Sequence, residues 1–236
     1  MSVMNIGAGM SAGLLLFATV TGVGLCQNAR QGGEVKTSPV QEKARIILPP
    51  PDRTGRMTLE QALARRRSVR EFTAQGLSEQ ELSQLLWAAQ GITHPDGRRT
   101  APSAGALYPL ELYVATASGF YHYDPHEHRL NLHSEGDLRP ALYRASSEQD
   151  CVREAPAVFV ITAIYERTER EYGRERGPRY VHLEAGHAAQ NMLLQAVPLG
   201  LGGVPVGAFH DDAVQKALSL PRDHQPVYLI PIGHPR

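Results

Sequence analysis

The chain has 236 residues, of which 42% are hydrophobic and 20% charged, and its 24 lysine and arginine residues balance 24 aspartate and glutamate residues. This length suits one globular domain with an adequate core. A formal net charge of zero lacks the basic excess typical of nucleic-acid-binding surfaces, so no nucleic-acid partner is expected. The two cysteines, Cys26 and Cys151, show no paired spacing that would indicate a zinc site or a disulfide framework.

The N-terminal residues 1–26 form an apolar leader. Residues 6–26 contain no charged side chain, and they are about long enough to span a bilayer or to form the core of a secretory signal. No lysine or arginine precedes them, and Leu25 stands before Cys26 where a lipoprotein cleavage box has a small residue. A disordered leader or a misassigned start is the alternative. We expect a signal or membrane anchor, and an exported or membrane-attached location rather than a cytoplasmic one.

Residues 27–56 differ in composition and read as a Pro/Gly-rich linker. Pro49, Pro50 and Pro51 favour extended backbone and cannot continue a helix. The segment is either a linker or an arm that wraps a partner subunit. The globular domain is expected over residues 57–236.

The first half of this domain begins with two capping boxes, Thr58–Gln61 and Ser78–Glu81. The first predicts a helix to about Arg66, and the second a helix with apolar residues at helical spacing that ends at Gly91. A loop over 93–106 follows. A buried strand is expected over 112–117, then a hairpin with strands at 120–124 and 130–133.

The second half predicts a helix over 137–145, a central strand over 157–164, and a long helix over 179–197. Residues 204–209 read as a short strand or extended loop. Asp211 is expected to cap a helix to Leu218, and Pro231 places the final strand, 227–232, at a sheet edge. Helices and strands mix without strict alternation, which predicts an α+β domain with a mixed sheet. No Gly-x-Gly-x-x-Gly follows a strand, which argues against a Rossmann site.

A basic run at the end of the first predicted helix is the first candidate site. Arg66, Arg67 and Arg70 surround the hydroxyl of Ser68. Forked guanidinium donors match phosphate oxygens two at a time, so this run predicts a phosphate site. The alternative is a solvated helix end at which the arginines complement the dipole.

Three further segments are candidate parts of a binding site, and the first of them is rich in small residues that let the backbone approach a flat ligand. They are Pro102-Ser103-Ala104-Gly105-Ala106-Leu107-Tyr108-Pro109, Gly202-Gly203-Val204-Pro205-Val206-Gly207-Ala208-Phe209, and the C-terminal Gly233-His234-Pro235-Arg236. Each taken alone is consistent with an ordinary turn or terminus.

Together these segments, in this order from about Met57 to Arg236, resemble the FMN-dependent nitroreductase family, and the second resembles its SagB-type dehydrogenase branch. The resemblance implies an α+β fold with a mixed sheet flanked by helices, an intertwined homodimer, and FMN bound at the subunit interface. Arg66, Arg67 and Ser68 would then hold the FMN phosphate. Arg70 would lie near the flavin N1, where reduced flavin is negatively charged.

The resemblance also assigns the remaining cofactor-binding residues. Pro102, Ser103, Ala104 and Gly105 would contact flavin from the opposite side of the dimer interface. Pro205, Val206, Gly207 and Ala208 would cover one face of the ring, with a backbone N–H near Gly207 donating to flavin N5. Arg236 would reach the phosphate. The helix that contains Glu184 and His187 would pack at the dimer core, so both are expected to be structural. No side chain need act as an acid or base, so no catalytic residue is predicted.

The sequence departs from the azoline dehydrogenases of the branch at one point. Those enzymes carry a Lys-Tyr pair before the central helix, whereas here Glu171 precedes Tyr172. A carboxylate cannot replace an ammonium as proton donor at neutral pH, which argues against azoline oxidation. Four histidines could suggest a metal site, but their hairpin context favours none; they are His122, His126, His128 and His133.

Three functions follow. The first is an FMN oxidoreductase that takes hydride from NADH or NADPH and passes it to a small electrophilic acceptor, such as a quinone or a nitro compound. The second is a SagB-type dehydrogenase of a specific metabolite or peptide, without a nicotinamide. The third is a non-enzymatic flavin-binding or scaffold subunit, attached to a membrane through the leader.

Overall fold

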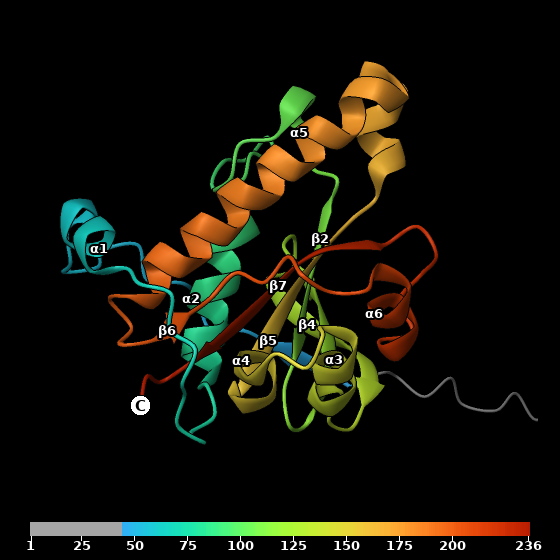
Figure 1. The fold of residues 1–236 in the computed structure, drawn as a ribbon. Helices are drawn as coiled ribbons and strands as arrows, with labels where there is room; N and C mark the ends of the chain where they lie inside the picture. Colours follow the sequence, from blue (N-terminus) through green and yellow to red (C-terminus); the bar gives the residue numbers. More distant parts are fainter. Residues whose placement is uncertain (1–43) are drawn as a thin grey trace, which may run out of the picture. The chain divides into compact units, whose positions relative to one another are not determined.

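Seven strands form one sheet in the computed structural model, which describes residues 44–236 (Figure 1). They are β1 (Arg45–Ile47), β2 (Leu110–Ala115), β3 (Gly119–Asp124), β4 (Arg129–Glu135), β5 (Ala157–Ala163), β6 (Gly202–Gly203) and β7 (Gln225–Gly233). Their order is β1-β4-β3-β2-β5-β7-β6, and every strand pair is antiparallel. A parallel contact occurs only at an isolated bridge from Ser68 to Gly203 among the described residues.

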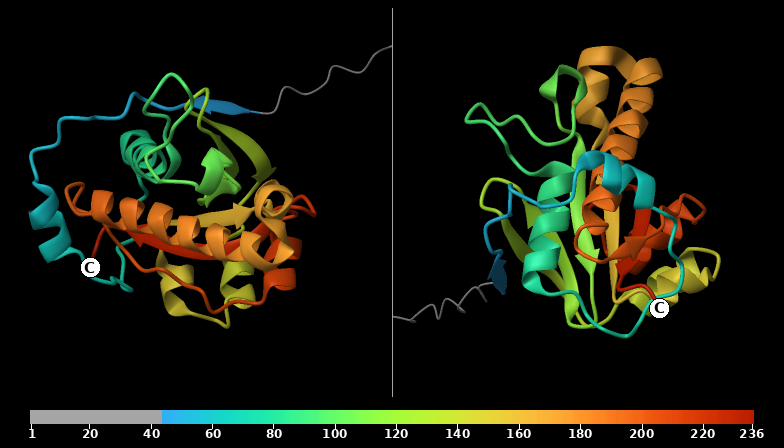
Figure 2. Two further views of the ribbon diagram at one scale, coloured as in Figure 1. Left: turned by 90° about the horizontal axis from the view of Figure 1, so that it is seen from above. Right: turned by 90° about the vertical axis from the view of Figure 1, so that its left-hand side faces the viewer.

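Helices cover both faces of this sheet. They are α1 (Leu59–Arg65), α2 (Glu79–Gln90), α3 (Arg139–Ala145), α4 (Asp150–Glu154), α5 (Tyr165–Ala196) and α6 (Asp211–Ala217), with a short 3₁₀ turn at Ala104–Ala106. Seen from above, α2 and α5 lie on one side of the sheet and α3 and α4 on the other (Figure 2). The expected α+β class with flanking helices is confirmed, but the sheet, which was expected to be mixed, is antiparallel in every pair of these strands.

The strand expected over 157–164 is confirmed as an interior strand of the sheet. All seven residues of β5 are buried, and β5 lies between β2 and β7. Alternate side chains enter two separate cores: Phe159 and Ile161 pack on the α2 and α5 side, while Val158 and Val160 face α3, α4 and α6. A continuous apolar run is the pattern of a strand that is covered on both faces.

Both predicted capping boxes are present. Thr58 and Ser78 each accept from the backbone N–H three residues on, and the Gln61 and Glu81 side chains bond back to the cap. The cap predicted for α6 is wrong by one residue. His210 is the N-cap, and Asp211 is the first helical residue, where a carboxylate favours the positive end of the helix dipole.

Helix α5 begins fourteen residues before the predicted start at Arg179. Gly173, with φ of 78° and ψ of 162°, interrupts it, so the element consists of two helical segments across a kink. The first segment carries charged side chains on most sides, including the exposed pair Glu166–Arg170 at 2.9 Å. Without an apolar stripe, its sequence has no helical periodicity to detect.

The predicted edge position of Pro231 is also corrected. Strand β7 is one strand in from the edge, between β5 and β6. The Pro231 carbonyl accepts from the Val204 N–H at 3.2 Å, so Pro231 faces the side occupied by the two-residue β6. The missing proline N–H is tolerated there because the neighbouring strand is so short.

Residues 44–56 fall inside the segment predicted as a linker, yet they belong to the fold. Strand β1 pairs with β4, Leu48 is 3% exposed, and the Asp52 N–H donates to Gln84 at 2.8 Å. The folded part therefore begins before Met57. The leader predicted over 1–26 lies outside the described residues. Within residues 44–236, no helix is both long and apolar enough to cross a membrane.

Candidate functional site

The arginine run and the Gly202–Ala208 segment lie side by side although they are far apart in the chain. Ser68 and Gly203 form a parallel bridge, and the Val69 N–H donates to the Gly203 carbonyl at 3.1 Å. A Cβ on Gly202 would lie 2.5 Å from Val69 Cγ2, so only glycine permits this approach. Two of the predicted cofactor segments are thus brought together.

The C-terminus joins the same region. Pro235 bridges to Phe72, and the Arg236 N–H donates to the Glu71 carbonyl at 3.2 Å. The Arg236 guanidinium donates to the Phe72 carbonyl at 3.0 Å and lies 3.6 Å from Glu154. The last residue is therefore anchored next to the arginine run, and its side chain already has protein partners.

The arginines of this run differ in what they contact. The Arg67 Nη1 donates to the Ala64 and Arg66 carbonyls at 2.9 and 2.8 Å, so this side chain caps the C-terminus of α1. Arg66 is half-buried, and Ser68 and Arg70 are exposed. No side chain of these three makes a hydrogen bond or ion pair within residues 44–236, which leaves their donors available for an anion.

The Gly202–Ala208 segment also presents an unused donor. Val206 exchanges backbone hydrogen bonds with Leu229 at 2.8 and 3.0 Å, which fixes Pro205 and Val206 against β7. The Ala208 carbonyl accepts from Gln149 at 2.8 Å. Between them, Gly207 is exposed, and its N–H has no acceptor in the part of the chain that the structure describes. The donor predicted for a flavin ring is therefore open to a ligand.

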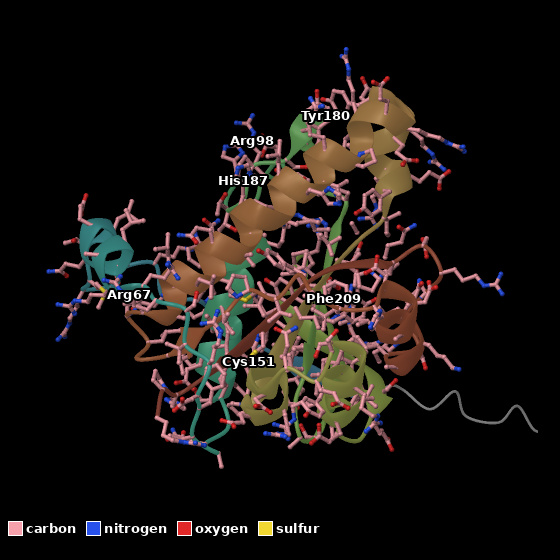
Figure 3. All side chains as sticks on the ribbon, viewed as in Figure 1. Arg67, Arg98, Cys151, Tyr180, His187 and Phe209 are labelled. Atoms are coloured by element: carbon pink, nitrogen blue, oxygen red, sulfur yellow. The ribbon has the colours of Figure 1, made fainter. Side chains whose placement is uncertain are left out.

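The remaining predicted segment, Pro102–Gly105, lies elsewhere. Gly105 has φ of +60°, and a Cβ there would be 3.0 Å from the Tyr172 hydroxyl. Tyr172 packs edge-to-face on Tyr180, with 4.7 Å between the two ring centroids. Tyr180 lies far from Arg67 (Figure 3). One chain therefore gathers the arginine run, the Gly202–Ala208 segment and Arg236, and holds Pro102–Gly105 apart from them.

A buried carboxyl lies behind this loop. Glu184 of α5, expected to be structural, is 3% exposed, and its Oε1 has no hydrogen-bond partner among the described residues. Burial raises the pKa of Glu184 to about 7, although the nearby Ser103 hydroxyl and Arg99 guanidinium oppose the rise. The sequence signal was available: Glu184 is a lone acid on a helix face of small residues.

Replacing Glu184 by Gln is expected to stabilise the protein at pH 8 by about 1–2 kcal/mol and to have no stabilising effect at pH 5. A folded-state pKa near 7, above the ordinary 4.5, means that wild-type stability falls as the pH rises from 4.5 through 7. Urea unfolding between pH 5 and 8 measures this difference. Glu175→Gln, an exposed position on the same helix, is the control and should show no such trend. A Glu184→Gln curve parallel to wild type at all pH values would contradict the expectation.

A second charged cluster was not singled out from the sequence. Glu111 of β2 contacts His122 at 2.7 Å and Arg167 at 2.6 Å, and its side chain is 16% exposed. Burial alone would raise the pKa of Glu111, but the His122 hydrogen bond and the Arg167 charge lower it to about 2. These three residues come from β2, β3 and α5, so no local pattern in the sequence joins them.

Three of the four histidines considered as metal ligands have hydrogen-bond partners within the protein, and the fourth is exposed. His122 bonds Glu111 at 2.7 Å, His128 bonds the Tyr123 hydroxyl at 2.9 Å, and His133 contacts the Ser219 carbonyl at 3.0 Å. His126 is exposed. Over residues 44–236, no group of three or more His, Cys, Asp or Glu side chains is arranged to hold a metal ion.

A family model described as the nitroreductase family matches residues 63–234. The chain belongs to the nitroreductase family, which is a family of oxidoreductases that generally use flavin. It is 44% identical over 181 residues to the candidate nitroreductase MJ1384 of Methanocaldococcus jannaschii, covering 74% of this chain and 90% of that protein. A solved structure of a candidate nitroreductase from Ralstonia eutropha has 36% identity and a TM-score of 0.76, covering 83% of this chain and 91% of that one.

The SagB-type branch is also represented among the relatives. The microcin B17-processing protein McbC of Escherichia coli is 31% identical over 157 residues, which cover 61% of this chain and 57% of that protein. The solved microcin synthetase McbBCD complex has a TM-score of 0.64 at 24% identity, which supports a shared fold.

Proposed function

We propose that this protein is an FMN-dependent oxidoreductase that moves hydride from NADH or NADPH to a small electrophilic acceptor, such as a quinone or a nitro compound. The observation that supports it best is that the arginine run pairs with the Gly202–Ala208 segment. This pairing brings Arg66, Ser68 and Arg70 to the segment that carries the free Gly207 N–H. Unpaired cations, a hydroxyl and an open backbone donor suit a ligand that combines a phosphate with a flat polar ring.

The protein is proposed to act as a homodimer whose two sites each use both chains. Pro102–Gly105 cannot join the arginine run of its own chain, so it would contact the flavin held by the partner. Exposed apolar side chains support such an interface: Leu59 and Leu63 of α1 are 62% and 51% exposed, and Leu183 of α5 is 54% exposed.

The residues of the chain would bind and orient the cofactor, and a bound flavin supplies the acceptance and release of hydride. Arg66, Ser68 and Arg236 would hold the phosphate, and the Gly207 N–H would donate to the ring. No side chain in these segments is required as an acid or base, so rate would depend on positioning and charge.

The test is the visible absorption spectrum of the full chain after FMN reconstitution, recorded before and after anaerobic NADPH or NADH. A bound flavin that bleaches would support the proposal. Protein that stays colourless after reconstitution would contradict it, and would favour a non-enzymatic scaffold.

A SagB-type dehydrogenase of a specific metabolite or peptide is the second candidate. Its support is the Ser103–Pro109 sequence, the likeness to McbC, and the Tyr172 hydroxyl beside Gly105. Because Glu171 stands where lysine is expected, azoline oxidation is not proposed. A flavin that binds but is not reduced by either nicotinamide would favour this candidate over the first.

A further inference from the structure

A cavity of about 330 Å³ opens where strands β2 and β3 part. The two strands pair only over Tyr113–Ala115 and Phe120–His122, so Leu110–Leu112 has a partner strand on the β5 side alone. The polar lining that matters consists of Gln90, Arg99, Glu111, His122, Asp124 and Arg167. None of these residues belongs to the predicted flavin segments.

The acidic groups of this cavity are already neutralised. Glu111 contacts His122 and Arg167 at 2.7 and 2.6 Å. Asp124 pairs with Arg129 at 3.3 Å and accepts from the His126 N–H at 3.0 Å. The negative charges of Glu111 and Asp124 are therefore already balanced and do not neutralise another cation in the cavity.

Arg99 is the cation of the cavity without an ion-pair partner, although the Glu111 and Glu184 carboxyls act on its charge from a longer distance. No Asp or Glu oxygen in the described chain lies within 4.0 Å of it; its Nη1 donates to the Gln90 amide oxygen at 3.0 Å, and its guanidinium lies 4.5 Å from the Tyr108 ring. The Arg99 Nε and the Gln90 Nε2 are both buried without an acceptor. Two neighbouring buried donors without an acceptor, one of them on a cation, favour the binding of an anion, because an unmet buried donor is destabilising. The buried Glu184 carboxyl lies near both side chains, so a bound anion would compete with it for these donors.

We propose that this cavity binds a small organic monocarboxylate through Arg99 and Gln90. A guanidinium fork fits carboxylate and phosphate alike, but Arg99 is a single cation whose charge the nearby Glu184 carboxyl already offsets in part, so a monoanion is favoured over a dianion. The volume lies near the lower end of the range for ligand pockets, about 300–1,000 Å³, which suits a ligand of aromatic-acid size.

The site stands independently of the flavin proposal, although it borders the flavin loop. The Arg99 N–H donates to the Tyr108 hydroxyl at 3.1 Å, and Arg167 donates to the Tyr108 carbonyl at 3.0 Å. A carboxylate bound by Arg99 would therefore lie close to Tyr108, in the loop that also contains Pro102–Gly105. Binding and flavin content can be measured separately on the same sample.

The experiment is ¹⁹F NMR titration of the full chain with 4-fluorobenzoate. The neutral isostere 4-fluorobenzamide and inorganic phosphate serve as comparison ligands. We expect benzoate to bind, with Arg99→Gln weakening it at least tenfold. Arg98→Gln is the matched control, since Arg98 is 71% exposed and pairs with Asp96 at 2.9 Å; it should leave binding unchanged.

Three results would overturn the proposal: no benzoate binding by wild type, equal binding of the benzamide, or tighter binding of phosphate. If Arg99→Gln does not fold, wild type still tests the site. Nuclear Overhauser effects from the probe to His122 and Leu112 are expected, and their absence in a saturated complex would place the ligand elsewhere. Flavin absorbance per chain, recorded in each sample, keeps a loss of cofactor distinct from a loss of this site.

Discussion

Arg66→Ala is expected to raise the dissociation constant for FMN about 10- to 150-fold. One or more charge-assisted hydrogen bonds to phosphate would be lost, each contributing about 1.5–3 kcal/mol. Arg66 is half-buried next to the Ser68–Gly203 bridge and has no side-chain partner in the described structure, so its donors are uncommitted. Titration of the flavin-free protein with FMN, followed by flavin fluorescence, measures the change.

Two neighbouring arginines sharpen this experiment. Arg65→Ala removes an equal charge from the exposed last residue of α1 and should leave FMN affinity nearly unchanged. Arg67→Ala should weaken FMN less than Arg66→Ala, because Arg67 already donates to two carbonyls of the helix end. Equal FMN affinity in Arg66→Ala and wild type would mean that this run is only a solvated helix end.

The parts of the fold that the sequence predicts well are those with local causes. Thr58 and Ser78 cap their helices through residues three positions away, and the apolar run Ala157–Ala163 identifies a strand covered on both faces. Such signals act within a few residues, so they survive without knowledge of the rest of the chain.

The parts that were missed depend on distant partners. The first segment of α5 has no apolar stripe, and Pro231 is accommodated by the shortness of β6 rather than by an edge. The site shows the same division. Residue types in the arginine run indicated an anion, whereas the capping contacts of Arg67 and the burial of Glu184 arise only when separate elements pack.

Arg167→Leu is expected to lower the free energy of unfolding by about 2–3 kcal/mol at pH 7. Removing one partner of a buried ion pair typically costs about 3–5 kcal/mol, and the Arg167 side chain is 39% exposed, so solvent reduces the effect. The carboxylate of Glu111 would keep only His122, and the Tyr108 carbonyl would lose a donor. Urea unfolding of wild type and variant at pH 7 measures the difference.

The pH dependence identifies Glu111 as the cause. Its folded-state pKa of about 2 lies below the ordinary 4.5, so its contribution to stability is complete above pH 4.5 and is lost as the pH falls toward 2. The gap between wild type and Arg167→Leu should therefore shrink below pH 4.5. Arg170→Leu, which breaks the exposed pair with Glu166, is the matched control, at about 0.3–0.5 kcal/mol. Similar losses in both variants would show that Glu111 is not held by a buried pair, whereas partial recovery in Glu111→Gln/Arg167→Leu would confirm that the unpaired carboxylate causes the loss.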